Sequence, residues 1–232
     1  MQSDLKIFSS TAMYSIFQEL LPRFNKETGV LPSVIFDSSN MILDRVHSGE
    51  VADVIILTNL AIDRLAKEGK VASNGHTNIA KSGMGIVVRS GTTHPDISSV
   101  RALKNTLMHV NSIAYTTTGA SGVYFTKLIN ILGLAEQLKD KLITPKGGHV
   151  AKIVASGDAE IGVQLTSELL GIPGVEYVGN LPVELQMNTI FIAAIFSNTG
   201  KSLEASKFIH FLSLPDFSPI YKQFGMEFIG TS

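Results

Sequence analysis

The chain contains 232 residues, of which 44% are hydrophobic and 17% charged, so it can bury a substantial core as one large domain or two smaller lobes. Its formal net charge of -1 argues against a nucleic-acid-binding surface, and no nucleic acid is expected as a partner. It has no cysteine, which excludes disulfides, thiol nucleophiles and thiolate metal sites. The longest apolar run, from Ile190 to Phe196, is far shorter than the roughly 20 residues of a membrane-spanning helix.

Strands and helices are predicted to alternate along the first third of the chain. Leu5–Phe8 is a predicted strand, and apolar residues spaced by three and four predict a helix from Met13 to Phe24, with Gly29 as its stop. The same order repeats in two further strand–helix pairs: 34–36 with 42–46, and 52–57 with 62–65. Such alternation is typical of an α/β protein with parallel strands.

The alternation continues through the rest of the chain. Further strands are predicted over 84–88, 112–115, 161–163, 175–178 and 188–196. Further helices are predicted over 100–107, 121–132, 149–155, 202–212 and 217–224. No internal repeat or low-complexity linker interrupts this pattern. If there are two lobes, strands such as 83–89 and 188–195 would join them.

Two clusters of hydroxyl side chains each follow a predicted strand and precede a predicted helix. The clusters are Ser9-Ser10-Thr11 and Asp37-Ser38-Ser39-Asn40. Such side chains cap a helix because their oxygens accept hydrogen bonds from its first N–H groups. The start of a helix also carries positive partial charge, so the two clusters together predict a small anion-binding site that contains no cationic side chain.

Two loops of small residues, Gly119–Gly122 and Lys146–His149, also precede predicted helices. The first loosely resembles the G-x-S-x-G turn of esterases, but its second glycine comes one position early and no His–Asp pair can be assigned. Each helix start alone is explained by capping. Four of them in one α/β chain favour a site for an oxyanion or a carboxylate.

Metal and nucleotide sites have no support in the sequence. The six histidines are scattered, with no pair at i, i+4 and no carboxylate at ligand spacing. Neither a Walker A motif nor a G-x-G-x-x-G motif follows any predicted strand. No metal and no other cofactor is therefore expected.

Several segments, in order and nearly from end to end, carry a resemblance to a known family. They are Ile7–Ser10, Asp37–Ser39, Ser48–Val54, Gly122–Tyr124, Val154–Gly162, Phe208–Phe211 and Phe224–Met226. In these segments the chain resembles a divergent branch of the periplasmic molybdate-binding proteins, which belong to the type II periplasmic solute-binding proteins of ABC importers. The resemblance implies two α/β lobes around a ligand cleft, each a mixed, mainly parallel sheet flanked by helices, joined by two hinge strands. Lobe one would comprise 1–83 and 192–232, and lobe two 84–191.

The resemblance also implies ligand positions, residue by residue. The family's second-loop hydroxyl falls on Ser39, and its backbone contacts fall on Ser121 and near Gly147 or Gly148. Its first-loop serine and its tyrosine fall on Ala12 and Leu165, whose side chains donate no hydrogen bond. The amide, hydroxyl and carboxyl groups around the latter position suit an asymmetric organic acid. They belong to Gln164, Thr166, Ser167 and Glu168.

The expected function is an extracytoplasmic solute-binding protein of an ABC transporter, not an enzyme. Its ligand would be a small anion, either an oxyanion such as molybdate or a small organic carboxylate, and its other partner a membrane permease. The predicted ligand-binding residues are Ser10, Thr11, Ser39 and Asn40 in lobe one and Ser121, Gly122, Gly148, Gln164 and Ser167 in lobe two. Arg89 is the nearest candidate for a charge partner, and the protein itself is expected to be a monomer.

The start of the chain, Met1–Asp4, has neither the basic residues nor the apolar stretch of a signal peptide. A mature periplasmic or extracellular protein is expected, and a cytoplasmic location stays open. Two alternative functions stay open with it. One is a cytoplasmic ligand-sensing domain of the same fold, and the other is an enzyme acting on a small organic acid with Glu168 or His149 as its base.

Overall fold

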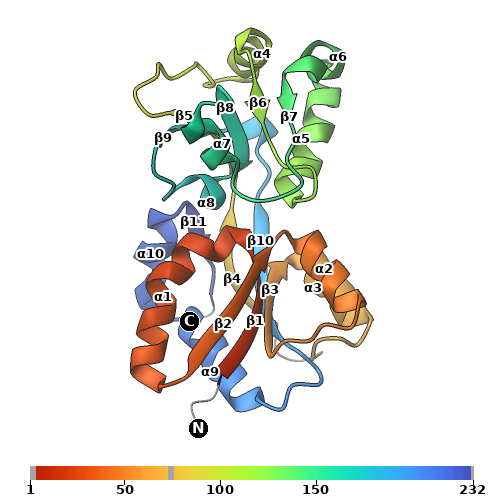
Figure 1. Ribbon diagram of the computed structural model, residues 1–232, viewed down its shortest axis with the longest axis vertical. Coiled ribbons are helices and arrows are strands. Elements are labelled where there is room, and N and C mark those ends of the chain that lie inside the picture. Colours follow the sequence, from red (N-terminus) through yellow and green to blue (C-terminus); the bar gives the residue numbers. More distant parts are fainter. Residues whose placement is uncertain (1–3, 73–75, 231–232) are drawn as a thin grey trace. The chain divides into compact units, whose positions relative to one another are not determined.

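The computed structural model describes residues 4–72 and 76–230 and divides into two compact units (Figure 1). Unit 1 combines Met1–Lys81 with Thr189–Ser232, and unit 2 is the continuous stretch Ser82–Asn188. The chain therefore leaves unit 1 once and returns to it once. That lobes 1–83 with 192–232 and 84–191 act as separate bodies stays a prediction, and Met1–Ser3 of the first lobe lie outside the described residues.

The sheet of unit 1 has the strand order β11-β4-β10-β3-β1-β2. Its strands are β1 (Asp4–Ser10), β2 (Leu31–Asp37), β3 (Val54–Thr58), β4 (Thr77–Ser82), β10 (Thr189–Ile195) and β11 (Met226–Phe228). β1 runs parallel to β2 and to β3, whereas β10 runs antiparallel to β3. Because β1, β2 and β3 share one direction, the segments that follow them leave the sheet at the same edge.

Helices cover both faces of this sheet. On one side in Figure 1 lie α2 (Ser39–His47) and α3 (Asn59–Lys67), and on the other α1 (Tyr14–Thr28), α9 (Ser202–Leu212) and α10 (Ser218–Gln223). The 3-10 turns η1 (Thr11–Met13) and η4 (Pro215–Phe217) precede α1 and α10. α1 ends where Gly29 takes a φ of 72°, a left-handed conformation that glycine adopts without steric cost.

Phenylalanine rings hold α1 against α9. The Phe24 ring lies 5.0 Å from that of Phe208 and 5.2 Å from that of Phe211, and the Phe17 ring lies 5.9 Å from that of Phe208. All of these rings are buried, and the pairs meet edge to face. Each such pair stabilises the fold by about 0.5–1.5 kcal/mol beyond the burial of its apolar area. This cluster fixes the C-terminal helix α9 to the N-terminal helix α1.

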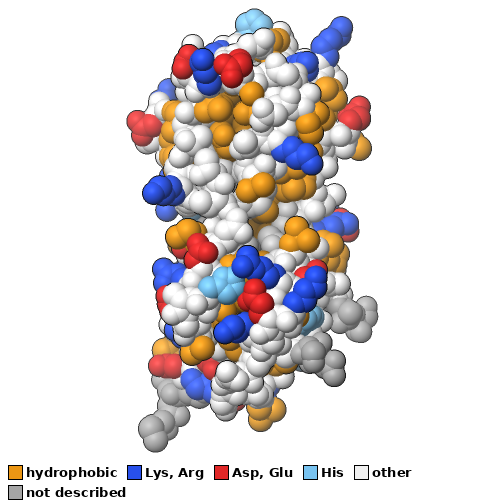
Figure 2. All heavy atoms as spheres, turned by 90° about the vertical axis from the view of Figure 1, so that its right-hand side faces the viewer, with side chains coloured by type: hydrophobic (Ala, Val, Ile, Leu, Met, Phe, Trp, Pro, Cys, Tyr) orange, Lys and Arg blue, Asp and Glu red, His pale blue; other side chains and the backbone are white. Residues whose placement is uncertain are grey.

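The outer side of α2 and α3 is charged. Arg45 pairs with Glu50 at 3.0 Å, and Glu68 pairs with His47 at 2.8 Å and with Arg64 at 3.0 Å. Figure 2 shows acidic, basic and histidine side chains mixed over this part of unit 1. Surface pairs of this kind contribute about 0–1 kcal/mol each, so this face is best described as solvated surface.

The sheet of unit 2 has the strand order β7-β6-β8-β5-β9. Its strands are β5 (Met84–Arg89), β6 (Ile113–Ala114), β7 (Leu142–Ile143), β8 (Ile161–Leu165) and β9 (Val175–Asn180). β6 runs parallel to both β7 and β8, while β5 runs antiparallel to β8 and β9. The segments that follow β6, β7 and β8 therefore leave this sheet at one common edge.

The helices of unit 2 are α4 (Val100–His109), α5 (Ala120–Ile131), α6 (Ala135–Leu138), α7 (Val150–Ser156) and α8 (Thr166–Leu169), with 3-10 turns η2 (Lys139–Lys141) and η3 (Val183–Leu185). One buried apolar cluster of this unit centres on α7. Val150, Ala151 and Val154 of this helix are buried and belong to one cluster with Val87 of β5 and Ala114 of β6. This packing sets the position of the loop that leads into α7.

The mixed α/β architecture predicted from the sequence is confirmed. The sequence pattern missed β4, β7, β11, α6 and α8. β7 has two residues, β11 three, and α6 and α8 four each, which is too short for a periodic signal. Of the helices formed by residues 4–72 and 76–230, none is long and apolar enough to cross a membrane.

Candidate functional site

The first candidate edge is formed in unit 1 by the ends of β1, β2 and β3. Ser10 at the end of β1 is in register with Asp37 at the end of β2, and Ser9 is in register with Ile56 of β3. β3 ends at Thr58, two residues after Ile56. Both predicted hydroxyl clusters thus come to one edge of the sheet.

The first cluster caps η1. Ser10 Oγ accepts a hydrogen bond from Ala12 N at 3.3 Å, and Ser9 Oγ donates to Ser10 O at 3.2 Å. Ser10 and Thr11 are both buried. A serine oxygen that accepts one backbone bond keeps a rotatable O–H, so Ser10 can still donate to an anion.

The second cluster caps α2 and reaches β3. Ser38 Oγ accepts from Met41 N at 3.3 Å, while the buried Ser39 Oγ accepts from Thr58 N at 3.3 Å. Asn40 is exposed on the first turn of α2. Thr58 itself was missed, although it follows a buried strand and precedes a helix in the same way as the two named clusters. Ser39 therefore ties two of the three strand ends together while its own O–H proton remains available for donation.

The second candidate edge is formed in unit 2 by the ends of β6, β7 and β8. The segment after β6 leads into α5, the segment after β7 leads through Gly148 into α7, and β8 continues directly into α8. Every lobe-two residue predicted from the sequence lies on one of these three paths or, for Gln164, at the end of β8.

The start of α5 requires a residue without a side chain. A Cβ atom on Gly122 would lie 1.6 Å from the carbonyl oxygen of Thr116, so only glycine fits there. Ser121 beside it is buried. No side chain of the described residues caps α5 at Gly119. The helix therefore presents its first N–H groups uncapped, which suits a negatively charged ligand group.

The amide of Gln164 braces the loop before α7. Its Oε1 accepts from Val150 N at 3.0 Å, and its Nε2 donates to Gly148 O at 2.9 Å. Glu168 accepts a further hydrogen bond from the Gln164 side chain and one from the Leu165 backbone. Gln164 thus connects β8, the Gly148 loop and α8. Its direct role in ligand binding stays a prediction.

Ser167 carries a buried hydroxyl with no protein partner. Its backbone N donates to Ser82 Oγ at 3.2 Å, but its own Oγ has no hydrogen-bond partner within residues 4–72 and 76–230. A buried polar atom left unpaired costs about 1–3 kcal/mol. Such an atom next to Gln164 and Glu168 is the kind of group that a ligand would satisfy.

Glu168 is the buried acid of this edge. Its side chain is removed from water, and this burial raises the pKa of the carboxyl from 4.5 to about 8, against the two hydrogen bonds that lower it. The carboxyl therefore carries a proton near neutral pH. Its position as the third residue of α8, with a bond back to Leu165, is also that of a helix-capping glutamate.

His149, just before α7, contacts the backbone of α8. Its Nδ1 lies 3.1 Å from the carbonyl oxygen of Glu168, and since a carbonyl only accepts, Nδ1 carries the proton. Burial is the main cause that lowers the pKa of His149, and the nearby charge of Lys152 lowers it further. The ring is therefore neutral near pH 7, with the lone pair on Nε2. Glu168 and His149 are then both uncharged.

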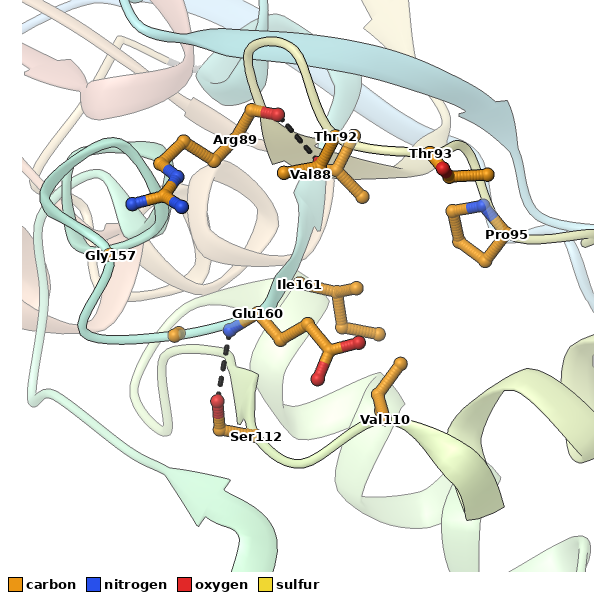
Figure 3. A pocket seen from close by; sticks show the side chains of 11 residues that line it. Val88, Arg89, Thr92, Thr93, Pro95, Val110, Ser112, Gly157, Glu160 and Ile161 are labelled. Atoms are coloured by element: carbon orange, nitrogen blue, oxygen red, sulfur yellow. Dashed lines mark hydrogen bonds between the residues drawn. The ribbon is translucent and has the colours of Figure 1, made fainter.

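A cavity of about 420 Å³ lies at the opposite edge of the same sheet (Figure 3). The start of β8 and the end of β5 line it, and Figure 3 shows the Glu160 side chain reaching between Ile161 and Val110. Glu160 already accepts hydrogen bonds from Asn111 N at 2.7 Å and Asn111 Nδ2 at 2.8 Å. Arg89, the predicted charge partner, lines this cavity. It follows that Arg89 does not belong to the edge that holds the predicted ligand residues.

Metal ligands do not gather in the part of the chain that the structure describes: no group of three or more His, Asp or Glu side chains there could hold a metal ion. The donors at the two edges are hydroxyls, amides and backbone N–H groups, which suit an anion better than a cation.

Glu168→Gln should remove a pH dependence of stability. The pKa of Glu168 is higher in the folded protein than its usual 4.5. The stabilisation of the folded state that comes from protonating Glu168 is therefore fully present below about pH 4.5 and is lost as the pH rises through about 8. Over this window the free energy of unfolding of the wild type should fall relative to that of Glu168→Gln by up to about 1.4 kcal/mol per pH unit. Urea unfolding of both proteins at several pH values measures this, and parallel pH profiles would contradict it.

The relatives of the chain include one protein named as an enzyme and one named as a binding protein. It is 29% identical over 229 residues to an aconitate isomerase from Pseudomonas sp, covering 96% of this chain and 87% of that protein. It is 20% identical over 233 residues to the molybdate-binding protein ModA of Escherichia coli (strain K12), covering 97% and 89%. The structure of the Azotobacter vinelandii periplasmic molybdate-binding protein matches with a TM-score of 0.82 at 18% identity, over 98% of this chain and 100% of that one, which shows the type II periplasmic binding protein fold. Since residues 5–227 match its sequence pattern, the chain belongs to the family of bacterial extracellular solute-binding proteins.

Proposed function

We propose that this protein is the substrate-binding component of an ABC importer and that its ligand is a small organic polycarboxylate. The observation that carries the proposal is the chemistry of the two strand edges. Each offers buried hydroxyls beside helix starts: Ser10 and Ser39 in unit 1, Ser121 and Ser167 in unit 2. Neutral donors of this kind hold carboxylates and oxyanions in proteins.

The side chains at the two edges favour a carboxylate over molybdate as the ligand. Ala12 and Leu165 stand where the molybdate-binding family offers a serine and a tyrosine, and both side chains are buried and apolar. The unpaired Ser167 hydroxyl and the Glu168 carboxyl lie next to Leu165 instead. A relative with 29% identity is named for aconitate, a tricarboxylate. Asymmetric donors suit a ligand with several unlike oxygen groups.

The proposed function also implies a membrane partner, an oligomeric state and a cellular location for the protein. A membrane permease would receive the ligand, the protein would act as a monomer, and it would work outside the cytoplasm as its family description implies. Ser10, Thr11, Ser39 and Asn40 from unit 1 would contact the ligand. Ser121, Gly122, Gly148, Gln164 and Ser167 would contact it from unit 2.

A panel of anions tests the ligand class. We expect trans-aconitate, cis-aconitate, citrate or tricarballylate to raise the melting temperature, whereas molybdate, tungstate, sulfate and phosphate should leave it unchanged. A ligand at about 100 times its Kd stabilises the folded state by roughly 2.7 kcal/mol, which a thermal-shift measurement detects. Stabilisation by molybdate alone would overturn the carboxylate assignment while keeping the binding function.

Ser39→Ala should weaken the binding of the carboxylate that the panel identifies. Loss of one hydrogen bond to a charged group costs at least ~1 kcal/mol, so Kd measured by calorimetry should rise at least about fivefold. Because Ser39 Oγ also accepts from Thr58 N, the unfolding free energy is measured beside Kd. Ser202→Ala, at an exposed serine that starts α9, is the matched control and should leave Kd unchanged. An unchanged Kd in Ser39→Ala would remove this residue from the site.

A second candidate function, an isomerase acting on an unsaturated polycarboxylate, is favoured by one specific observation. Isomerisation that moves a carbon–carbon double bond requires a base that takes a proton from carbon and an acid that returns one. Glu168, with a pKa of about 8, can hold or release a proton near neutral pH. His149, just before α7, carries an unprotonated Nε2, and its Nδ1 lies 3.1 Å from the carbonyl oxygen of Glu168. The relative named aconitate isomerase supports this reading.

Turnover separates the two candidates. Purified protein is incubated with trans-aconitate, and proton NMR follows the appearance of cis-aconitate. An isomerase should interconvert the two until equilibrium, and Glu168→Gln should lower the rate by at least about a hundredfold, the usual scale for a proton-transferring group. Binding without conversion would leave the importer component as the function.

A further inference from the structure

Glu168 is a buried carboxyl at the unit 2 edge, where the proposed carboxylate ligand would bring further negative charge. On the basis of that proposed ligand, we propose that this site takes up its carboxylate ligand together with one proton, and that Glu168 holds this proton while the ligand is bound. Glu168 would thus be a ligand-binding residue that acts as a neutral hydrogen-bond donor.

The position of Glu168 links it to all parts of the edge. It lies on α8, which continues directly from β8, the parallel neighbour of β6. The Gln164 side chain donates to its carboxyl, and the same amide holds Gly148 O at 2.9 Å and Val150 N at 3.0 Å. The unpaired Ser167 hydroxyl precedes it in the sequence. A ligand at this edge therefore meets Glu168 or groups bonded to it.

The charged and titratable groups around α8 do not neutralise an ionised Glu168. α8 packs against β5, β8 and α7. β8 has no titratable residue, and the one on β5, Arg89, lines the cavity at the opposite edge. From α7 come Lys152 and, just before the helix, the neutral His149, and Tyr177 of β9 bonds Thr166 Oγ1 at 3.2 Å. No charge–charge interaction contributes to the pKa of Glu168 among the described residues.

An ionised Glu168 would therefore oppose a second anion. Two buried negative groups repel each other, and no charge–charge interaction with a described residue stabilises an ionised Glu168. The cheaper state is therefore the one in which one of the two groups is protonated. The carboxyl has two acceptor bonds from Gln164 and Leu165, and when protonated it gains an O–H that can donate to the ligand. The proton comes from solvent, so binding above the pKa of Glu168 consumes one proton per ligand.

The experiment measures proton uptake on binding. Titration calorimetry of trans-aconitate is run in buffers of different ionisation enthalpy between about pH 7.5 and about pH 9.5, where the carboxyl groups of the ligand are ionised. For the wild type, uptake should rise from a small fraction toward one proton per ligand, and Kd should weaken by up to tenfold per pH unit above about pH 8. Glu168→Gln, which keeps a neutral donor, should bind with no rise in uptake and a flat Kd.

A control variant and two different negative results separate the role of Glu168 from the proposed function. Glu184→Gln removes an exposed carboxyl from η3 of the same unit and should behave as the wild type. Binding with no uptake across the pH range, or with equal uptake in Glu168→Gln, would overturn the role of Glu168 and leave the carboxylate ligand standing. Absence of binding at every pH would instead contradict the proposed function. If Glu168→Gln folds poorly, the pH dependence of the wild-type Kd tests the proposal by itself. A wild-type Kd that stays constant as the pH rises through about 8 overturns the role of Glu168.

Discussion

Parallel pairing of short strands is the constraint on which both candidate edges depend. In unit 1, the register of β1 with β2 sets Ser10 level with Asp37, and in unit 2 the pairing of β6 with β7 and β8 gathers three strand ends. Parallel strands deliver the loops that follow them to one edge, where backbone N–H groups and hydroxyls converge. The direction of the strands therefore determines where the polar groups of each unit gather, and the individual side chains determine what they can bind.

The unit 2 edge is organised by one amide and one acid. Gln164 uses both ends of its amide to hold the loop before α7, and it donates to Glu168 as well. An amide is suited to this role because it donates and accepts without carrying charge. The result is a polar network in which Glu168 has no charge partner among the described residues. In the proposed bound state, a proton on Glu168 would take the place that an arginine or lysine fills elsewhere.

Most of the fold could be predicted from the sequence because its longer elements have clear periodicity. The helix ending before Gly29 follows directly from apolar spacing and a glycine stop, and the helix 202–212 from apolar spacing alone. α8 could not be predicted, because four residues carry no period, and Thr58 was missed although its setting repeats that of Ser10. Arg89 shows a different limit. Sequence spacing gives no indication of which edge of an antiparallel strand a residue will occupy, and Arg89 lies at the edge away from the predicted ligand groups.

The discontinuous make-up of unit 1 has a consequence for how the chain matures. β10 lies between β4 and β3, so the sheet of unit 1 has a gap in its middle until residues beyond 188 have been synthesised. Unit 2 is one continuous stretch and can complete its sheet earlier. Until β10 is synthesised, the edge of β3 that pairs with it would have unpaired backbone N–H and C=O groups. Such an unpaired strand edge can associate with other chains. The last fifth of the polypeptide thus acts as the closing step of the whole fold.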